Sequence, residues 1–201
     1  MLISFVGSPC SGKTTTAAML FSKLKEGGLP VEFLTEFARL YIAKERNKLQ
    51  PGEKLSLTDA DQLTIMKVQA DWENAMDQSL ASVKGGLVIS DTSSLNAMLY
   101  MSPEGRNNPE VKAMARKAIQ NSSLVFYNKP VDKDPQDKFL DRNDPNRVHS
   151  VEQSRTIDAE IHDLLKGLGL DHYTLLVGSP EARLGRAYQA VNSTLGQSRA
   201  A

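Results

Sequence analysis

Several features that define common protein classes are missing from this sequence. The chain of 201 residues has a single cysteine, so it cannot form an intramolecular disulfide, and a reducing compartment is expected. No apolar run approaches the roughly 18 residues of a membrane span, and no basic segment with a cleavage site opens the chain. We therefore expect a soluble, cytoplasmic protein with no membrane partner.

An excess of charge is missing as well. The 24 basic and 24 acidic residues give a formal net charge of zero. Affinity for duplex DNA comes largely from neutralising phosphates with Lys and Arg, so this balance gives no support for strong binding of a polyanion. Repeats and low-complexity segments are absent too. The length favours one domain over residues 1–201 with a sizeable core, and the oligomeric state is not predicted.

What the sequence does contain is a regular alternation of short apolar runs and helical patterns. The apolar runs predict strands at 2–6, 31–34, 87–90, 124–127 and 173–177. Helices are predicted at 13–25, 36–46, from Thr58 to about 80, 93–101, 109–120, 150–166 and 180–195. This order is typical of an α/β fold with a five-stranded, mostly parallel sheet and helices on both faces. Residues 128–150 are polar and lack periodicity, which predicts a mobile lid.

The first predicted strand runs into a glycine-rich loop that ends in a helix. The loop reads Gly7-Ser8-Pro9-Cys10-Ser11-Gly12-Lys13-Thr14. It matches the phosphate-loop pattern, in which glycines let backbone N–H groups surround phosphate oxygens at a helix N-terminus. Lys13 is suited to neutralise the β- and γ-phosphates, and the Thr14 hydroxyl to ligate Mg²⁺. We expect this loop, with the adjacent Thr15, to bind ATP and Mg²⁺ in a three-layer P-loop NTPase fold.

Two acidic residues follow neighbouring predicted strands. In such sheets ligands bind at the carboxyl ends of the strands, so both residues are candidates for the same site. Asp91 suits the second ligand of Mg²⁺, although an N-cap of the following helix is the alternative. Glu36 suits the general base that accepts a proton from an attacking hydroxyl, although a first-turn residue favoured by the helix dipole is the alternative. Which of the two carboxylates acts as the base stays open.

Arginines near the predicted sheet edge are candidates for contact with the nucleotide. Arg142 and Arg147 lie in the polar segment, where a mobile arginine can stabilise the charge that develops on the transferred phosphoryl group. A solvated loop of balanced charge is the alternative. Arg183 follows the fifth strand and is a candidate contact of the nucleobase, with a plain strand–helix turn as the alternative.

In this order of motifs, the chain resembles P-loop kinases of the nucleoside, nucleotide and ribosylnicotinamide type. A closer likeness is to phage kinases that phosphorylate 5-hydroxymethyluracil in DNA, carried by Leu34-Thr35-Glu36-Phe37-Ala38, Ile89-Ser90-Asp91-Thr92-Ser93 and Arg147-Val148-His149-Ser150. The resemblance implies phosphoryl transfer from ATP to a hydroxyl of a base in hydroxymethylated phage DNA, and the host cytoplasm as its location. Thr92 stands where nucleoside and thymidylate kinases commonly have arginine.

Two alternatives remain open at this point. The first is a small-molecule kinase that acts on a free nucleoside, nucleotide or ribosylnicotinamide. The second is a switch NTPase that binds nucleotide in order to change its partners. Basic side chains flanking the acceptor pocket would favour DNA, whereas a closed, apolar pocket would favour a free small nucleoside-like molecule.

Overall fold

The computed structural model describes residues 1–130 and 151–200, and its element order is the predicted one apart from one additional short helix, α4. The elements are β1 (Leu2–Val6), α1 (Lys13–Glu26), β2 (Val31–Leu34), α2 (Phe37–Arg46), α3 (Asp59–Leu80), β3 (Leu87–Ser90), the 3₁₀ helix η1 (Ser94–Tyr100), α4 (Pro103–Asn107), α5 (Pro109–Asn121), β4 (Ser122–Asn128), α6 (Val151–Gly167), β5 (Thr174–Leu176) and α7 (Pro180–Ala200). Apart from residues 128–130, the segment predicted as a lid lies outside the described residues.

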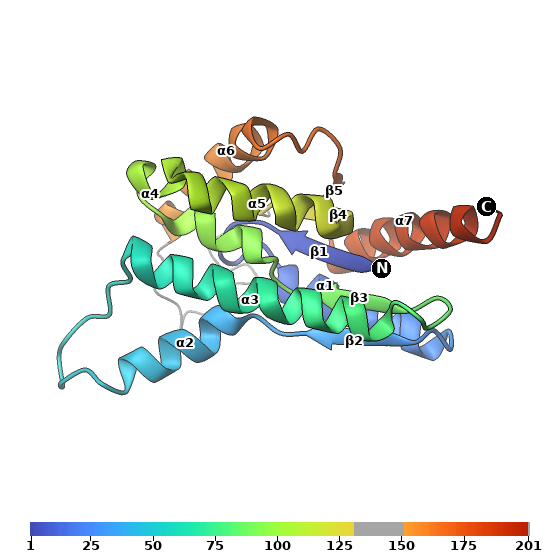
Figure 1. Cartoon of the computed structure of the whole chain (residues 1–201), viewed down its shortest axis with the longest axis horizontal. Coiled ribbons are helices and arrows are strands. Elements are labelled where there is room, and N and C mark those ends of the chain that lie inside the picture. Colours follow the sequence, from blue (N-terminus) through green and yellow to red (C-terminus); the bar gives the residue numbers. More distant parts are fainter. Residues whose placement is uncertain (131–150, 201) are drawn as a thin grey trace.

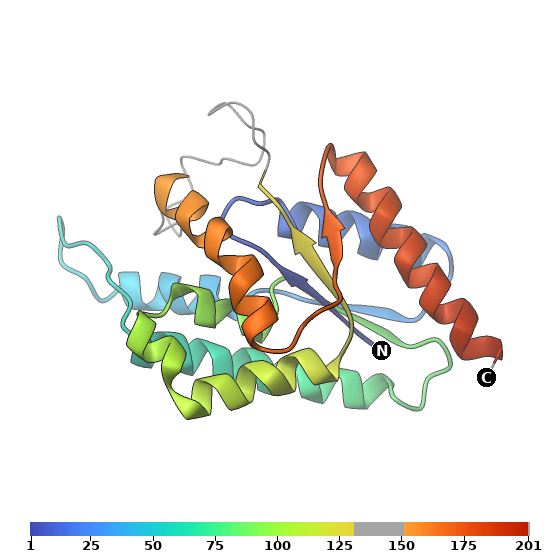
Figure 2. The ribbon, with the colours of Figure 1, turned by 90° about the horizontal axis from the view of Figure 1, so that it is seen from above.

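The five strands form one sheet in the order β2-β3-β1-β4-β5, and every neighbouring pair is parallel. The predicted sheet is confirmed, and it has no antiparallel strand among the described residues. Because all strands run the same way, their carboxyl ends meet at one edge of the sheet (Figure 2). The loops that follow β1, β2 and β3 therefore lie together at that edge.

Helices cover both faces of the sheet and complete the three layers (Figure 1). On one face α1 packs with α7 through Leu20 and Val191, which join Phe5 and Phe126 of the sheet in one apolar cluster. On the other face a second cluster joins α3, η1, α5 and α6, with Met66, Met98 and Ile161 among its buried members. Both clusters hold β1 rigidly, and β1 leads directly into the phosphate loop.

Helix α3 buries only part of the stripe that its apolar residues predict. Ile65 is buried, and Met76 and Leu80 pack partly buried against a small cluster of Leu2, Leu34 and Val88. The sequence predicts a core-facing stripe of Ile65, Val68, Trp72, Met76 and Leu80. The residues that are buried are Gln62, Ile65, Met66, Gln69 and Glu73. Trp72, predicted in the core, is 37% exposed and packs edge-on against Phe37, so that prediction is wrong. The helix thus presents polar side chains to the interior, beside the carboxyl ends of β2 and β3.

Two local features near η1 differ from the predicted helices. The predicted helix at 93–101 is a 3₁₀ helix, and α4 is an additional short helix that the sequence pattern did not reveal. The backbone N–H of Ser102 donates to Asp59 Oδ1 over 2.8 Å, and Ser102 caps α4 in turn. This contact ties the start of α3 to the end of η1. None of the helices in the described ranges is long and apolar enough to cross a membrane.

Candidate active site

The phosphate loop connects β1 to α1 through backbone conformations that favour glycine. Gly12 has φ +81°, and Cys10 takes a left-handed conformation at φ +61°. A Cβ atom at Gly7 would lie only 2.6 Å from the backbone oxygen of Asn128, which leaves no room for a side chain there. The glycines of the motif are therefore required by turn geometry and by close packing against β4.

The Lys13 side chain folds back over the loop. Its Nζ atom donates to the backbone oxygens of Gly7 at 2.9 Å and Ser8 at 3.0 Å, and the residue is only 8% exposed. Burial lowers the pKa of Lys13, while the nearby carboxylates of Glu36 and Asp91 act in the opposite direction. A positive charge held at a helix N-terminus by two carbonyls is well placed to bind phosphate.

Asp91 meets the first turn of α1, because β3 lies next to β1 in the sheet. The Thr14 hydroxyl donates to Asp91 Oδ2 over 2.9 Å. Burial, followed by the charge of Glu36, raises the pKa of Asp91 to about 6. The alternative of Asp91 as a helix N-cap does not hold, since Ser93 caps η1 by accepting the Leu95 N–H.

The residues around this contact fit a magnesium nucleotide. Among the described residues, Ser8 Oγ, Ser11 Oγ and Asp91 Oδ1 are buried without a hydrogen-bond partner. The hydroxyl of Thr14 and the carboxylate of Asp91 are the hard oxygen donors that Mg²⁺ prefers. The described part of the chain has no group of three or more metal-binding side chains.

Glu36 lies at the N-cap position of α2 and makes no side-chain capping bond there. Its carboxylate pairs with Arg39 over 3.4 Å, and the Glu36 side chain is 19% exposed. It is close enough to Lys13 and Asp91 to act on the pKa of both. The fold thus brings the three predicted groups Lys13, Glu36 and Asp91 to one edge of the sheet.

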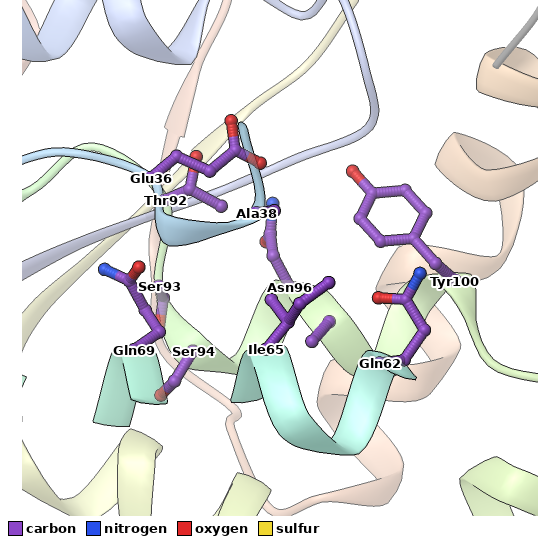
Figure 3. Close-up of a pocket in the computed structure, with 11 residues that line it drawn as sticks. Glu36, Ala38, Gln62, Ile65, Gln69, Thr92, Ser93, Ser94, Asn96 and Tyr100 are labelled. Atoms are coloured by element: carbon purple, nitrogen blue, oxygen red, sulfur yellow. The ribbon is translucent and has the colours of Figure 1, made fainter. Parts of the chain in front are cut away.

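A small pocket opens beside these groups, between α2, α3 and η1 (Figure 3). Its cavity volume is only about 20 Å³, within about 260 Å³ of space that includes open solvent. Its lining residues are Glu36, Ala38, Gln62, Ile65, Gln69, Thr92, Ser93, Ser94, Asn96, Ala97 and Tyr100. Figure 3 shows Glu36 and Thr92 at one end and Gln62 and Tyr100 at the other. No basic residue is among the described residues that line it.

Asn96 connects this pocket to the phosphate loop, and sequence reasoning missed it. Its Nδ2 atom donates to the Gly7 oxygen over 3.1 Å, and its Oδ1 atom accepts the Gly7 N–H over 3.4 Å. The side chain is fully buried. Lys13 and Asn96 thus share the Gly7 carbonyl as acceptor. A lone asparagine 89 residues beyond Gly7 gives no signal in a single sequence.

Arg183 takes a position that its place in the sequence did not reveal. The residue is 1% exposed. Its guanidinium donates to the backbone oxygens of Ser11, Gly178 and Lys129. Arg183 therefore ties the phosphate loop to the ends of β4 and β5, and its contact with a nucleobase stays a prediction.

The other two predicted arginines, Arg142 and Arg147, lie outside the described residues. Just beyond that segment, α6 returns to the phosphate loop. There the Ser154 hydroxyl donates to the backbone oxygen of Pro9. The first turn of α6 is thereby anchored at the loop that we expect to hold ATP, and the roles of both arginines stay predictions.

Among solved structures, the chain is similar to one described as the crystal structure of NadR protein in complex with NR. The identity is 20%, the TM-score is 0.65, and the match covers 97% of this chain and 51% of that one. The chain thus spans about half the length of that protein, and at this identity the likeness shows the fold alone. A structure of APE1195 matches with a TM-score of 0.48 at 19% identity, over 96% of this chain and 95% of that one.

No curated protein sequence matches the chain. A family model does match, and it covers residues 2–183. That range includes every strand of the sheet, the phosphate loop, both acidic residues and Arg183. Together with the three-layer P-loop NTPase fold, this match shows that the chain belongs to the family described as the AAA domain.

Proposed function

We propose that this protein is an ATP- and Mg²⁺-dependent kinase that phosphorylates a hydroxyl group of a small nucleoside-like acceptor. The observation that carries the proposal is that the pocket between α2, α3 and η1 adjoins the phosphate loop. Two residues that line this pocket also act on the loop. Glu36 lines this pocket and acts on Lys13, and Asn96 lines it and binds Gly7. A phosphoryl donor and an acceptor would therefore meet at Glu36.

Each of the chain's own groups has one role in this mechanism. Lys13 donates to the β- and γ-phosphates, and Thr14 and Asp91 hold Mg²⁺. Mg²⁺ held by Thr14 and Asp91 would supply Lewis-acid neutralisation of the charge that develops during phosphoryl transfer. Glu36 accepts the proton of the acceptor hydroxyl while the acceptor oxygen bonds to the γ-phosphorus and the bond to the β-phosphate oxygen breaks. Arg142 and Arg147 remain candidates to stabilise the transferred group.

The pocket favours a free molecule over a base in DNA. It is small, and its described lining residues include no Lys or Arg to neutralise DNA phosphates. The neutral total charge agrees with this. The structural similarity to the NadR protein, which was solved in complex with NR, also supports a small nucleoside-like acceptor. A flipped hydroxymethyluracil in DNA would require additional contacts to the strand outside this pocket.

The test is transfer of label from γ-labelled ATP with Mg²⁺. Separate reactions offer free nucleosides and nucleotides, ribosylnicotinamide, hydroxymethyluracil-containing DNA and unmodified DNA, with the Lys13→Met variant as the inactive control. We expect label in the free pool alone. Label only in the modified DNA would replace the proposed acceptor. Free phosphate without any labelled acceptor, together with nucleotide-dependent association, would favour the switch NTPase.

A further inference from the structure

The two acidic residues of the site lie on separate loops, and the sheet stops before it reaches them. Strands β2 and β3 pair up to Leu34 and Ser90. Within the described residues, the last backbone hydrogen bond between these strands runs from the Asp91 N–H to the Leu34 oxygen, at 2.9 Å. Beyond it the chains diverge, Asp91 toward η1 and Glu36 into α2. Something other than the sheet must therefore fix the position of Glu36 relative to Asp91.

The side chain of Gln69 spans this gap from α3. Its Oε1 atom accepts the backbone N–H of Phe37, the residue after Glu36, over 2.8 Å. Its Nε2 atom donates over 3.3 Å to the hydroxyl of Ser90, the residue before Asp91. Gln69 is 3% exposed and lines the pocket (Figure 3). The Gln69 amide thus joins Phe37, which follows Glu36, to Ser90, which precedes Asp91.

The β3 end of this link is anchored by a second buried side chain of α3. Glu73 Oε1 accepts the Ser90 hydroxyl at 2.7 Å and the Ser94 N–H at 3.0 Å, and Glu73 Oε2 accepts the Ser94 hydroxyl at 2.7 Å. Ser90 donates to Glu73, so its oxygen is oriented to accept from Gln69. The three hydrogen bonds from Phe37 to Glu73 all point in the same direction, and successive hydrogen bonds in such a chain polarise one another.

We propose that Gln69 is a positioning residue that holds the Glu36 loop against the Asp91 loop and thereby sets the rate of phosphoryl transfer. This inference rests on the proposed function, because the rate depends on Glu36 as the base. The amide is suited to the task because it both accepts and donates on a short, rigidly held side chain. Displacements near 1 Å at a catalytic group cost on the order of 10² in rate.

The test compares Gln69→Met, which keeps volume but loses both hydrogen bonds, with Tyr41→Phe. The control also removes a hydrogen bond between α2 and α3, from Tyr41 to Asp61 at 2.6 Å, but neither residue lines the pocket. We expect Gln69→Met to lower kcat about 30-fold with KM for ATP within about twofold, and Tyr41→Phe to leave kcat within about twofold. A fall of less than about threefold for Gln69→Met overturns the proposal.

A double-mutant cycle separates positioning from general destabilisation. If Gln69 acts through Glu36, adding Gln69→Met to Glu36→Gln should cost less than about threefold, since the positioned group is already gone. If Gln69→Met and Glu36→Gln lower kcat independently, so that their effects multiply, the proposal is overturned. If Gln69→Met fails to fold, Ser90→Ala removes the β3 partner of Gln69 with little change in volume, and a fall in kcat of about tenfold is expected. An unchanged kcat overturns the proposal.

Hydrogen exchange at the Phe37 amide provides a readout that needs no activity. Gln69→Met should speed this exchange at least about tenfold, while Tyr41→Phe should leave it unchanged. If the wild-type protein phosphorylates none of the acceptors, the proposed function fails and this comparison alone decides about Gln69. Faster exchange in Gln69→Met then supports the link that Gln69 makes between the Glu36 loop and the Asp91 loop. Unchanged exchange overturns that link.

Discussion

The phosphate loop and the floor of the neighbouring pocket both bury polar atoms, but they satisfy them differently. The floor consists of Gln69, Glu73, Ser90 and Ser94, whose side chains bind one another, whereas Thr92 Oγ1 of the pocket lining is buried without a partner among the described residues. At the phosphate loop, the described contacts leave Ser8 Oγ, Ser11 Oγ and Asp91 Oδ1 without partners. The floor is therefore preorganised, whereas the loop carries buried groups that a bound ligand would satisfy.

This difference has an energetic consequence. A buried polar atom without a partner costs about 1–3 kcal/mol. The phosphate loop bears that cost in the nucleotide-free protein, and it also buries Lys13 and Asp91 close to one another. Ligand binding should then stabilise the loop far more than the floor. The four predictions below test this contrast, starting from the largest effect.

Removing the cation of the phosphate loop should abolish the reaction. Lys13→Met deletes the charge that faces the β- and γ-phosphates, and we expect phosphoryl transfer to fall by about 10³ or more. The measurement is label transfer from γ-labelled ATP. Lys23→Met removes a lysine from the exposed face of the same helix and should leave the rate unchanged. Retained activity in Lys13→Met would refute the assignment of the phosphate loop.

The Glu36 carboxylate, which lies between the phosphate loop and the neighbouring pocket, should affect the rate of the chemical step more than the binding of ATP. Glu36→Gln keeps size and polarity but removes the base, so we expect kcat to fall by about 10² while ATP affinity stays within about twofold. Steady-state kinetics and ATP titration measure the two effects. Glu32→Gln, on the exposed side of β2, is the control. A change in kcat below about threefold would move the base to Asp91 or to water.

The third prediction concerns stability, and its sign follows from the pKa of Asp91. Folding raises this pKa from 3.8 to about 6, so the folded protein holds the proton more tightly than the unfolded chain. The contribution to stability is full below pH 3.8 and is lost as pH rises through 6. A difference of about two pKa units corresponds to about 3 kcal/mol at most. With water entering the open site, we expect a cost of about 2 kcal/mol.

In Asp91→Asn, the side chain is uncharged at every pH and can still accept the Thr14 hydroxyl. The variant therefore removes the cost of ionising Asp91 in the folded protein. In the presence of EDTA and without nucleotide, its free energy of unfolding at pH 7.5 should exceed that of the wild type by about 2 kcal/mol. The gain should shrink toward zero near pH 4, as measured by urea denaturation. Asp71→Asn, on the exposed side of α3, should change stability equally at both pH values. A loss of stability in Asp91→Asn at pH 7.5 would contradict the contrast between loop and floor.

The loop and the floor also differ in how far sequence reveals them. The phosphate loop was predictable because eight consecutive residues contain its turn, its charge and its hydroxyl. Asp91 and Glu36 were predictable as neighbours because each follows an apolar run, and parallel strands bring their carboxyl ends together. The same alternation of apolar runs and helices was sufficient for the five-stranded sheet and for the order of elements apart from α4.

The floor was not predictable, because the residues that α3 contributes to it form a polar stripe, and a polar stripe suggests a solvent-facing side of the helix. Gln62, Gln69 and Glu73 lie at helical spacing on α3, and a polar stripe on an amphipathic helix ordinarily faces water. Only the fold shows that this stripe meets the ends of β2 and β3, while Trp72 is displaced toward the surface. Arg183 shows the same limit, since an arginine after a strand gives no sign of the backbone carbonyls that it binds.

The smallest expected effect tests the one side chain that joins the two regions. Asn96→Ala removes both hydrogen bonds to Gly7, so the loop loses a support, and we expect affinity for MgATP to fall about tenfold. Titration calorimetry measures the affinity, and Asn121→Ala, which removes an exposed bond to Asn74, should leave it unchanged. If Asn96→Ala binds MgATP like the wild type, Asn96 supports only the pocket, and the two regions are independent.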